Sequence, residues 1–449
     1  MIRALSDPDP RVRRTVAKVL GDRGDPRAAS ALVPSLVDPE PAVRASAAKA
    51  LGQIGRSESH GAIERALDDP DPRVREMAAW ALGRIGDPGS LDPLIRCMTD
   101  PASEVRLTAA GGLGRMRDPA ATRALLLALS DPNERVRRGA VIALGESEDP
   151  AVSDRLRSMF ADEARTVRNA TAIVMGRRRD RPSVSVLLER AGGGDPAERP
   201  AALVALGRIG DRRAEVTLVR AAEDPSHSVR VCALHALGEM RGTRARAVAL
   251  EHVSDPEHAV RGAAAICLGE VGTPTDLPVL FRLVEDPHPW PRSAAIYAIG
   301  RLGLIEAIPR VREELFHAAP EVRLAAIWTL GRLRDDASRA NLVRLLEPTL
   351  AHPDPLVPDA EGDAAAARAA DAEDRIFDTA VQALGRLRHP EEDPFVEEAL
   401  WDARALFSEE ELDRVARLPR VEVEGISRPP TLRDLFELAL PDGSRTEGG

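Results

Sequence analysis

The stretch DPDPRVREMAAWALGRIGD at residues 69–87 is a close copy of DPDPRVRRTVAKVLGDRGD at residues 7–25. A glycine follows the central arginine of each copy by eight residues, and an aspartate precedes it by six. The arginine recurs every 31 residues through eleven copies, at Arg13, Arg44, Arg75, Arg106, Arg137, Arg168, Arg199, Arg230, Arg261, Arg292 and Arg323. Two repeats lack the aspartate and have Gly193 and His317 in its place. A fixed period of this length predicts a stack of structural repeats.

Each repeat contains two predicted helices. The first is illustrated by residues 25–38, DPRAASALVPSLVD, whose apolar residues are three and four apart. Prolines in the following turn cannot lie inside a helix, so the second helix begins there, with Asp9 and Asp71 placed to cap it and Pro10 and Pro72 in its first turn. Neither helix can bury its apolar side alone, so we expect the repeats to stack into a continuous solenoid.

The repeated pattern D-P-x-x-x-V-R-x-x-A-A-x-A-L-G-x-I-G resembles the HEAT-repeat family, and within it the short bacterial repeats of phycobilin lyase subunits. The resemblance covers roughly residues 1–390. It implies an all-α fold, a right-handed α-solenoid of about twelve two-helix repeats with a 31-residue period. It further implies that the aspartate and arginine form a ladder between successive repeats and that the second helices line the concave side. It implies no particular activity, because the fold serves adaptors, scaffolds and a few enzymes.

The recurring arginine and glycine are therefore expected to be structural. An arginine paired with an aspartate is neutralised and is not a phosphate-binding stripe. A glycine inside a helix costs about 1 kcal/mol relative to alanine, and here it would let neighbouring backbones approach.

The period also divides the chain into segments. These are repeats 1–11 with the first helix of repeat 12 over 1–348, a Pro-, Ala- and Asp-rich insertion loop over 349–374, the second helix of repeat 12 over 375–390, and an acidic C-terminal segment over 391–449. Two short helices predicted in the last segment, at 407–418 and 429–440, either cap the final repeat or dock a partner. The first repeat begins within its first helix, and we expect its uncapped apolar end to allow self-association or partner binding.

Charge and composition restrict the classes of function. The net charge is -10, and residues 391–449 hold sixteen acidic and seven basic side chains, so residues 1–390 carry only -1. A nearly neutral body does not favour general binding to nucleic acid or to an anionic membrane. The sequence contains three cysteines and lacks a signal-like or membrane-spanning apolar run. We therefore expect a cytoplasmic protein.

Function is expected where the repeat varies. The residues one and five positions after each recurring arginine share a helical face and change freely from repeat to repeat. They are basic at the start and largely apolar or aromatic from Trp80 to Trp328. They either form an apolar groove for a protein segment or pack against the adjacent repeat. The groove hypothesis assigns protein binding to Arg14, Lys18, Lys49, Trp80, Leu107, Ile142, Ile173, Val204, His235, Ile266, Tyr297, Leu324 and Trp328.

Other chemistry finds less support. His227 and His258 are 31 residues apart and could stack in neighbouring turns near carboxylates, as in a metal site, but histidines at a turn are equally typical of a surface. A related HEAT-repeat hydroxylase family carries His-Glu pairs, and this sequence has none. The segment GRRRDRP at 176–182 is either a solvated loop or a contact for an acidic group. We assign no catalytic, metal or cofactor-binding residue.

The sequence therefore favours a non-enzymatic scaffold or adaptor that binds a protein partner along the second helices. Two alternatives stay open: an enzyme subunit of the bilin-lyase kind, and a nucleic-acid-binding solenoid that uses the arginine-rich edge.

Overall fold

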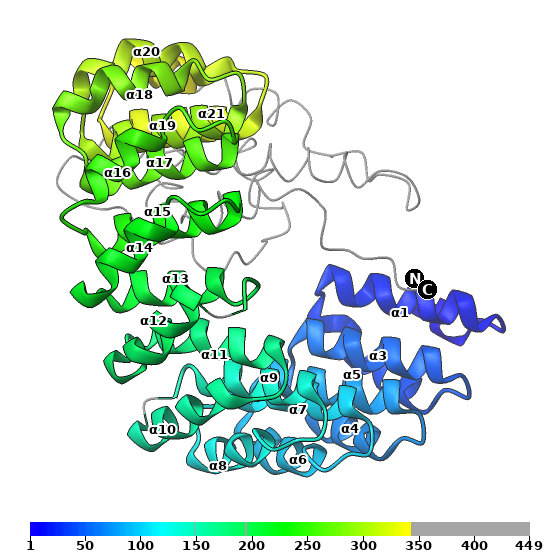
Figure 1. Cartoon of the computed structure of the whole chain (residues 1–449). Helices are drawn as coiled ribbons and strands as arrows, with labels where there is room; N and C mark the ends of the chain where they lie inside the picture. Colours follow the sequence, from blue (N-terminus) through cyan, green and yellow to red (C-terminus); the bar gives the residue numbers. More distant parts are fainter. Residues whose placement is uncertain (148, 194, 343–449) are drawn as a thin grey trace. The chain divides into compact units, whose positions relative to one another are not determined.

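The computed structural model describes residues 1–147, 149–193 and 195–342, and every regular element in these ranges is helical (Figure 1). The second helix of each repeat is the longer one. These helices are α1 (Pro10–Arg23), α3 (Pro41–Ile54), α5 (Pro72–Ile85), α7 (Ser103–Gly114), α9 (Glu134–Leu144), α11 (Arg165–Arg177), α13 (Arg199–Ile209), α15 (His227–Met240), α17 (His258–Val271), α19 (Pro289–Leu302) and α21 (Pro320–Arg332).

The turn chemistry that the sequence predicts starts these helices. Pro10 and Pro72 are the first residues of α1 and α5. Asp9 accepts a hydrogen bond from the main-chain N–H of Arg11, and Asp71 accepts one from that of Arg73. The predicted caps are confirmed, and each satisfies an N–H group that the helix itself cannot pair.

The first helices are shorter than the sequence suggests. Residues 25–38, expected as one helix, contain two 3-10 segments, Pro26–Ala28 and Val33–Val37, around a single α-turn, α2 (Ala29–Leu32). Pro34 lacks an N–H and so removes one α-helical hydrogen bond there. The corresponding helices are α4 (His60–Arg65), α6 (Leu91–Cys97), α8 (Pro119–Ala128), α10 (Pro150–Ser158), α12 (Val184–Gly193), α14 (Glu215–Ala221), α16 (Ala245–His252), α18 (Leu277–Val284) and α20 (Ile308–Glu313).

The chain divides into two compact units, Met1–Ile209 and Gly210–Gly449. Within each unit, successive second helices pack against one another in a row, from α1 to α13 in the first unit and from α15 to α21 in the second. The expected second helix of repeat 12, the insertion loop and the acidic C-terminal segment lie outside the described residues.

Seven of the recurring arginines join their own turn to the aspartate of the next turn. Arg13 Nε lies 2.7 Å from Asp38 Oδ2, and Arg13 Nη1 donates to the main-chain oxygen of Asp7, 2.7 Å away. The Asp38 carboxylate also accepts the main-chain N–H of Glu40 at 2.9 Å. The same ion pair recurs as Arg44–Asp69, Arg75–Asp100, Arg106–Asp131, Arg137–Asp162, Arg230–Asp255 and Arg261–Asp286. The expected ladder is confirmed.

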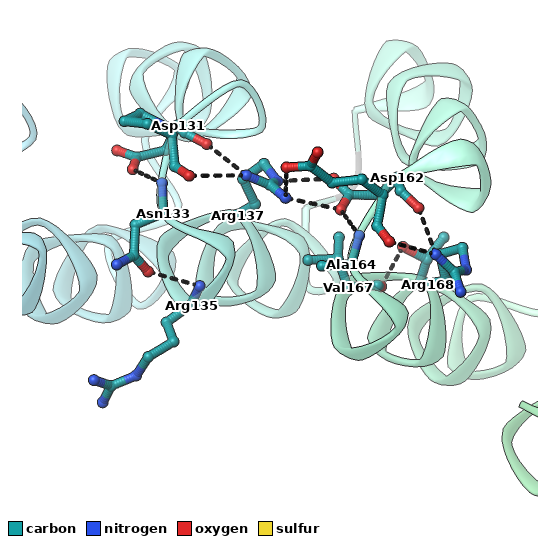
Figure 2. Close-up of polar contacts among 11 residues, drawn as sticks. Asp131, Asn133, Arg135, Arg137, Asp162, Ala164, Val167 and Arg168 are labelled. Atoms are coloured by element: carbon teal, nitrogen blue, oxygen red, sulfur yellow. Dashed lines mark hydrogen bonds and ion pairs between the residues drawn. The ribbon is translucent and has the colours of Figure 1, made fainter. Parts of the chain in front are cut away.

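Figure 2 shows one such junction. Arg137 donates through Nη1 to the main-chain oxygen of Asp131, 2.9 Å away, and binds the carboxylate of Asp162 in the next repeat at 2.8 and 3.0 Å. Asp162 in turn accepts the N–H of Ala164, and Arg168 donates to the main-chain oxygen of Asp162. Because Arg137 is buried, its guanidinium is committed to holding two turns together and is not offered to a ligand.

Both departures from the aspartate pattern are compensated by a buried glutamate. Gly193 stands where Arg168 would find its aspartate, and Arg168 Nε pairs instead with Glu198 Oε1 at 2.8 Å. His317 stands where Arg292 would find its aspartate, and Arg292 Nη2 pairs instead with Glu314 at 3.2 Å. His317 keeps the other part of the aspartate's role, because its Nδ1 accepts the N–H of Ala319.

In nine repeats the glycine eight residues after the ladder arginine lies where neighbouring second helices touch. A Cβ on Gly52 would lie 2.7 Å from the Cα of Ala81, and a Cβ on Gly176 would lie 2.7 Å from the Cα of Ala205. These distances are too short for real atoms, so the expected close approach of backbones is confirmed.

Candidate protein-interaction face

Three positions of each second helix lie on one side of it. Counting the ladder arginine as position zero, these are positions +1, +5 and +9, which are spaced by four residues and share a helical face where the helix is long enough. Arg115 and Glu146, at position +9, come just after the ends of α7 and α9. Because the second helices pack in a row within each unit, these positions line up from repeat to repeat, and this side of each unit is here called the second-helix face. The candidate binding residues inferred from the sequence occupy positions +1 and +5 of this face.

In the first unit the candidate residues remain open to solvent. Arg14, Lys18 and Lys49 are exposed. Ile142 is 48% exposed and Ile173 is 40% exposed, both large exposures for aliphatic side chains. Three further candidates, Trp80, Leu107 and Val204, are partly exposed.

In the second unit most of the same positions are buried. Trp328 is 2% exposed and Tyr297 is 5% exposed, and their rings stack with centroids 4.5 Å apart. Ile266 and Leu324 are also buried. His235 is partly exposed, but its ring nitrogen Nε2 is buried, and this burial lowers the pKa of the imidazole to about 4, so the ring is neutral at pH 7. Inter-repeat packing, one of the two alternatives that the sequence left open, thus describes these positions in the second unit. In the first unit the same positions remain exposed, and the groove stays a prediction.

Small residues at neighbouring positions receive the aromatic rings. A Cβ on Gly262 would meet the indole of Trp290 at 2.1 Å, and a Cβ on Gly300 would lie 2.8 Å from Trp328 Cζ3. A glycine paired with a tryptophan in the adjacent repeat therefore indicates inter-repeat packing. The sequence contained this signal, because these residues are 28 positions apart in both pairs.

Position +9 of the face was missed by the sequence analysis. It holds an arginine in six of eleven repeats, at Arg84, Arg115, Arg177, Arg208, Arg301 and Arg332. Arg115 and Arg332 donate through Nε to the main-chain oxygens of Gly83 and Gly300 in the preceding repeats, at 3.2 and 2.9 Å. Arg84 and Arg332 lie over the rings of Trp80 and Trp328, each 5.6 Å from the ring centroid. Because arginine recurs nine residues after the ladder arginine, a search of the sequence at this fixed offset would have identified position +9.

The second-helix face of the first unit is basic. Across positions +1, +5 and +9 it holds eight cations and three carboxylates, a net charge of +5: Arg14, Lys18, Lys49, Arg84, Arg115, Arg138, Arg177 and Arg208 against Asp22, Glu76 and Glu146. Burial, then the nearby carboxylate of Glu104, raises the pKa of Glu76, which weakens one of the three negative charges. The same positions of the second unit hold Glu239, Glu270, Arg301 and Arg332, a net charge of zero.

The arginine cluster at 176–182 is only partly available. Arg178 donates to main-chain oxygens of Gly145 and Ser147 and to the hydroxyl of Ser153, so it ties α11 to the preceding repeat. Arg179 adopts a left-handed backbone with φ of 52° and ends the helix. Arg177 and Arg181 are exposed, although Arg177 lies 3.3 Å from Glu146. The cluster is therefore mainly a helix end with Arg177 on the second-helix face.

Among the described residues, several groups that could support metal or nucleophilic chemistry already have other contacts or are buried, although His227 is exposed. The rings of His258 and His288 stack with centroids 3.6 Å apart. His252 lies near Glu223 and Glu251, but its two ring nitrogens already face the main-chain oxygens of Ala222 and Val248 at 2.9 and 2.8 Å. Burial raises the pKa of the thiols to about 11 at Cys97 and Cys232 and about 12 at Cys267, so they are protonated at neutral pH.

Comparison with known families matches HEAT repeats over residues 1–40, 30–110, 91–176, 184–259, 247–318 and 282–352. The chain belongs to the HEAT-repeat family. No curated protein matches it in sequence. Within the described ranges, no helix of this HEAT-repeat protein has the length and apolar character needed to cross a bilayer.

Solved structures agree with the fold. The yeast importin-beta Kap95p is 13% identical, with a TM-score of 0.50 over 91% of this chain and 63% of its own. Kap95p in a structure concerned with its binding to RanGDP gives the same TM-score at 12% identity, over 92% of this chain and 67% of its own. The CpcE–CpcF phycocyanin lyase complex from Nostoc sp. PCC7120 is 23% identical over 52% of this chain and 91% of its own, with a TM-score of 0.34. These likenesses concern the HEAT-repeat α-solenoid fold alone.

Proposed function

We propose that this HEAT-repeat protein is a non-enzymatic scaffold or adaptor that binds a protein partner along the second-helix face of its first unit. The observation that carries the proposal is the exposure of Ile142 and Ile173 on neighbouring helices of a basic face. Apolar side chains that remain exposed between charged ones are typical of protein-binding surfaces.

The proposal divides the residues that the sequence selected into two groups. Arg14, Lys18, Lys49, Ile142 and Ile173 contact the partner directly, with Trp80, Leu107 and Val204 contributing their exposed parts. The buried members, Ile266, Tyr297, Leu324 and Trp328, serve packing within the second unit, together with the neutral ring of His235.

Protein binding fits the face better than nucleic-acid binding. Five net positive charges are spread over seven repeats and interrupted by exposed isoleucines, whereas nucleic-acid sites concentrate uncompensated cations. The ladder arginines cannot add to the face, because aspartates and glutamates neutralise them. Kap95p offers a precedent only in the sense that a HEAT-repeat protein binds another protein, RanGDP. We place the function in the cytoplasm, where thiols such as free Cys97 stay reduced.

Comparative affinity capture tests the proposal. Wild-type protein and the double variant Ile142→Asp, Ile173→Asp are used as baits in extracts of the native cells. The control bait carries Val37→Asp and Leu127→Asp, which change two aliphatic residues that are 83% and 80% exposed elsewhere in the first unit. A partner retained by wild type and control but lost by the face variant supports the proposal. Equal retention by all three baits contradicts it.

A further inference from the structure

The second-helix face of the first unit calls for an occupant of defined chemistry. Carboxylates would complement its cations, and apolar side chains spaced to reach neighbouring helices would cover Ile142 and Ile173. An acidic segment with apolar residues at helical spacing meets both requirements. This inference rests on the proposed function, because it concerns the same face.

The chain itself contains such a segment outside the described residues. Residues 391–402, EEDPFVEEALWD, hold six carboxylates and no basic side chain. Phe395 and Ala399 are four residues apart, as are Val396 and Leu400, so a helix would place them on one side. This short segment supplies a net charge of -6 against the +5 of the face.

We propose that the acidic segment 391–402 of this chain binds the second-helix face of the first unit and must be displaced by a protein partner. Its carboxylates lie against cations such as Arg138 and Arg177, and its apolar side chains lie on Ile142 and Ile173. The corresponding face of the second unit is a poorer site, because its net charge is zero and Tyr297 and Trp328 are already buried.

The proposal is tested with two full-length proteins and one peptide. The first protein is wild type. The second, the amide variant, carries Glu391→Gln, Glu392→Gln, Asp393→Asn, Glu397→Gln, Glu398→Gln and Asp402→Asn. A fluorescent peptide of residues 391–402 is titrated with each protein, and its anisotropy gives the dissociation constant. We expect the amide variant to bind about tenfold more tightly, because its own segment no longer competes.

Charge reversals locate the site. In the amide variant, Arg138→Glu with Arg177→Glu is expected to weaken peptide binding by at least about tenfold. The matched control, Arg65→Glu with Arg123→Glu, makes the same charge change at exposed positions of α4 and α8 and is expected to leave binding within about twofold.

Two outcomes overturn the proposal. If the amide variant does not bind the peptide, the segment is not the occupant. If wild type and amide variant bind it equally tightly, the face is already free in the full chain and an acidic segment of another protein is its occupant. Neither outcome touches the proposed function, which is judged separately by whether the Ile142→Asp, Ile173→Asp bait loses its partner.

Discussion

Arg168 and Glu198 form an ion pair at 2.8 Å in a repeat that lacks the usual aspartate. Glu198 comes five residues after Gly193, which occupies the aspartate position, and its side chain is 5% exposed. It also pairs with Arg190, so one carboxylate serves two guanidinium groups. A carboxylate from the residue just before α13 has therefore replaced the usual aspartate at the position of Gly193.

Replacing this carboxylate should destabilise the protein. In Glu198→Gln, the half-buried Arg168 and Arg190 lose a buried countercharge, and we expect the free energy of unfolding to fall by about 2–3 kcal/mol. Urea unfolding followed by circular dichroism measures the change. Glu163→Gln is the control, because Glu163 also pairs with a ladder arginine but is 84% exposed; its effect should stay below about 1 kcal/mol. Equal losses in the two variants would contradict the role given to Glu198.

Two glycines of second helices should respond to alanine in opposite directions. Gly52→Ala places a Cβ 2.7 Å from the backbone of Ala81 and should destabilise by about 1–3 kcal/mol. Gly111→Ala introduces its Cβ into open space inside α7 and should stabilise by up to about 1 kcal/mol. Thermal unfolding of both variants checks the pair. A stabilising Gly52→Ala would show that the helices can separate without cost.

The ladder should make stability sensitive to acid. The hydrogen bond from Arg13 is the largest cause that holds the pKa of Asp38 below its usual range, and Asp69, Asp100, Asp131 and Asp286 have pKa values shifted in the same direction. Because the folded pKa is lowered, the stabilisation is fully present above the unfolded pKa of about 4 and is lost as pH falls through the folded pKa. Urea midpoints measured from pH 7 down to pH 2 should therefore decline below about pH 4.

Asp38→Asn isolates one step of this dependence. The amide can still accept the N–H of Glu40 but carries no charge, so the variant should be less stable at pH 7 and lose less stability on acidification than wild type does. Parallel curves for the two proteins would count against the ion pair as the source of the effect.

The column at position +5 should separate into stability and binding residues. Trp328→Ser removes a ring that is 2% exposed and stacked on Tyr297, and we expect a loss of about 3 kcal/mol. Ile142→Ser changes a side chain that is 48% exposed and should alter stability by less than about 0.5 kcal/mol. Chemical denaturation distinguishes the two. An unchanged midpoint for Trp328→Ser would show that Trp328 does not stabilise the packing and would support a role in binding instead.

Most of the fold followed from the period, because a strict 31-residue spacing repeats the same local physics in every copy. Prolines and aspartates at the turns fixed where second helices begin, and the recurring arginine and glycine could be assigned to contacts between repeats. The glutamates that replace aspartate were not foreseen, since Glu198 and Glu314 lie at different offsets from their arginines, and only the folded backbone shows that each reaches the guanidinium of a ladder arginine.

The candidate site was harder to predict. Tyr297 and Ile142 occupy the same repeat position, yet one is buried and the other exposed, because exposure depends on the size of neighbouring side chains in adjacent repeats. The repeat position of a residue predicts which side of the helix it lies on, but not which side chains of the adjacent repeats pack against it. Positions +1 and +5 of the first unit already carry a net charge of +3, and position +9, with Arg84 and Arg115, raises it to +5.

The constant spacing between partners of the ladder has a consequence for the length of the protein. Arg44 binds Asp69 and Arg75 binds Asp100, each 25 residues ahead, and no ladder arginine of repeats 1–5 depends on a residue beyond the next turn. Excising residues 45–75 would bring Asp100 to the same distance from Arg44 that Asp69 now occupies. Gene duplication or deletion in 31-residue modules can thus lengthen or shorten the array while every arginine keeps an aspartate partner 25 residues ahead.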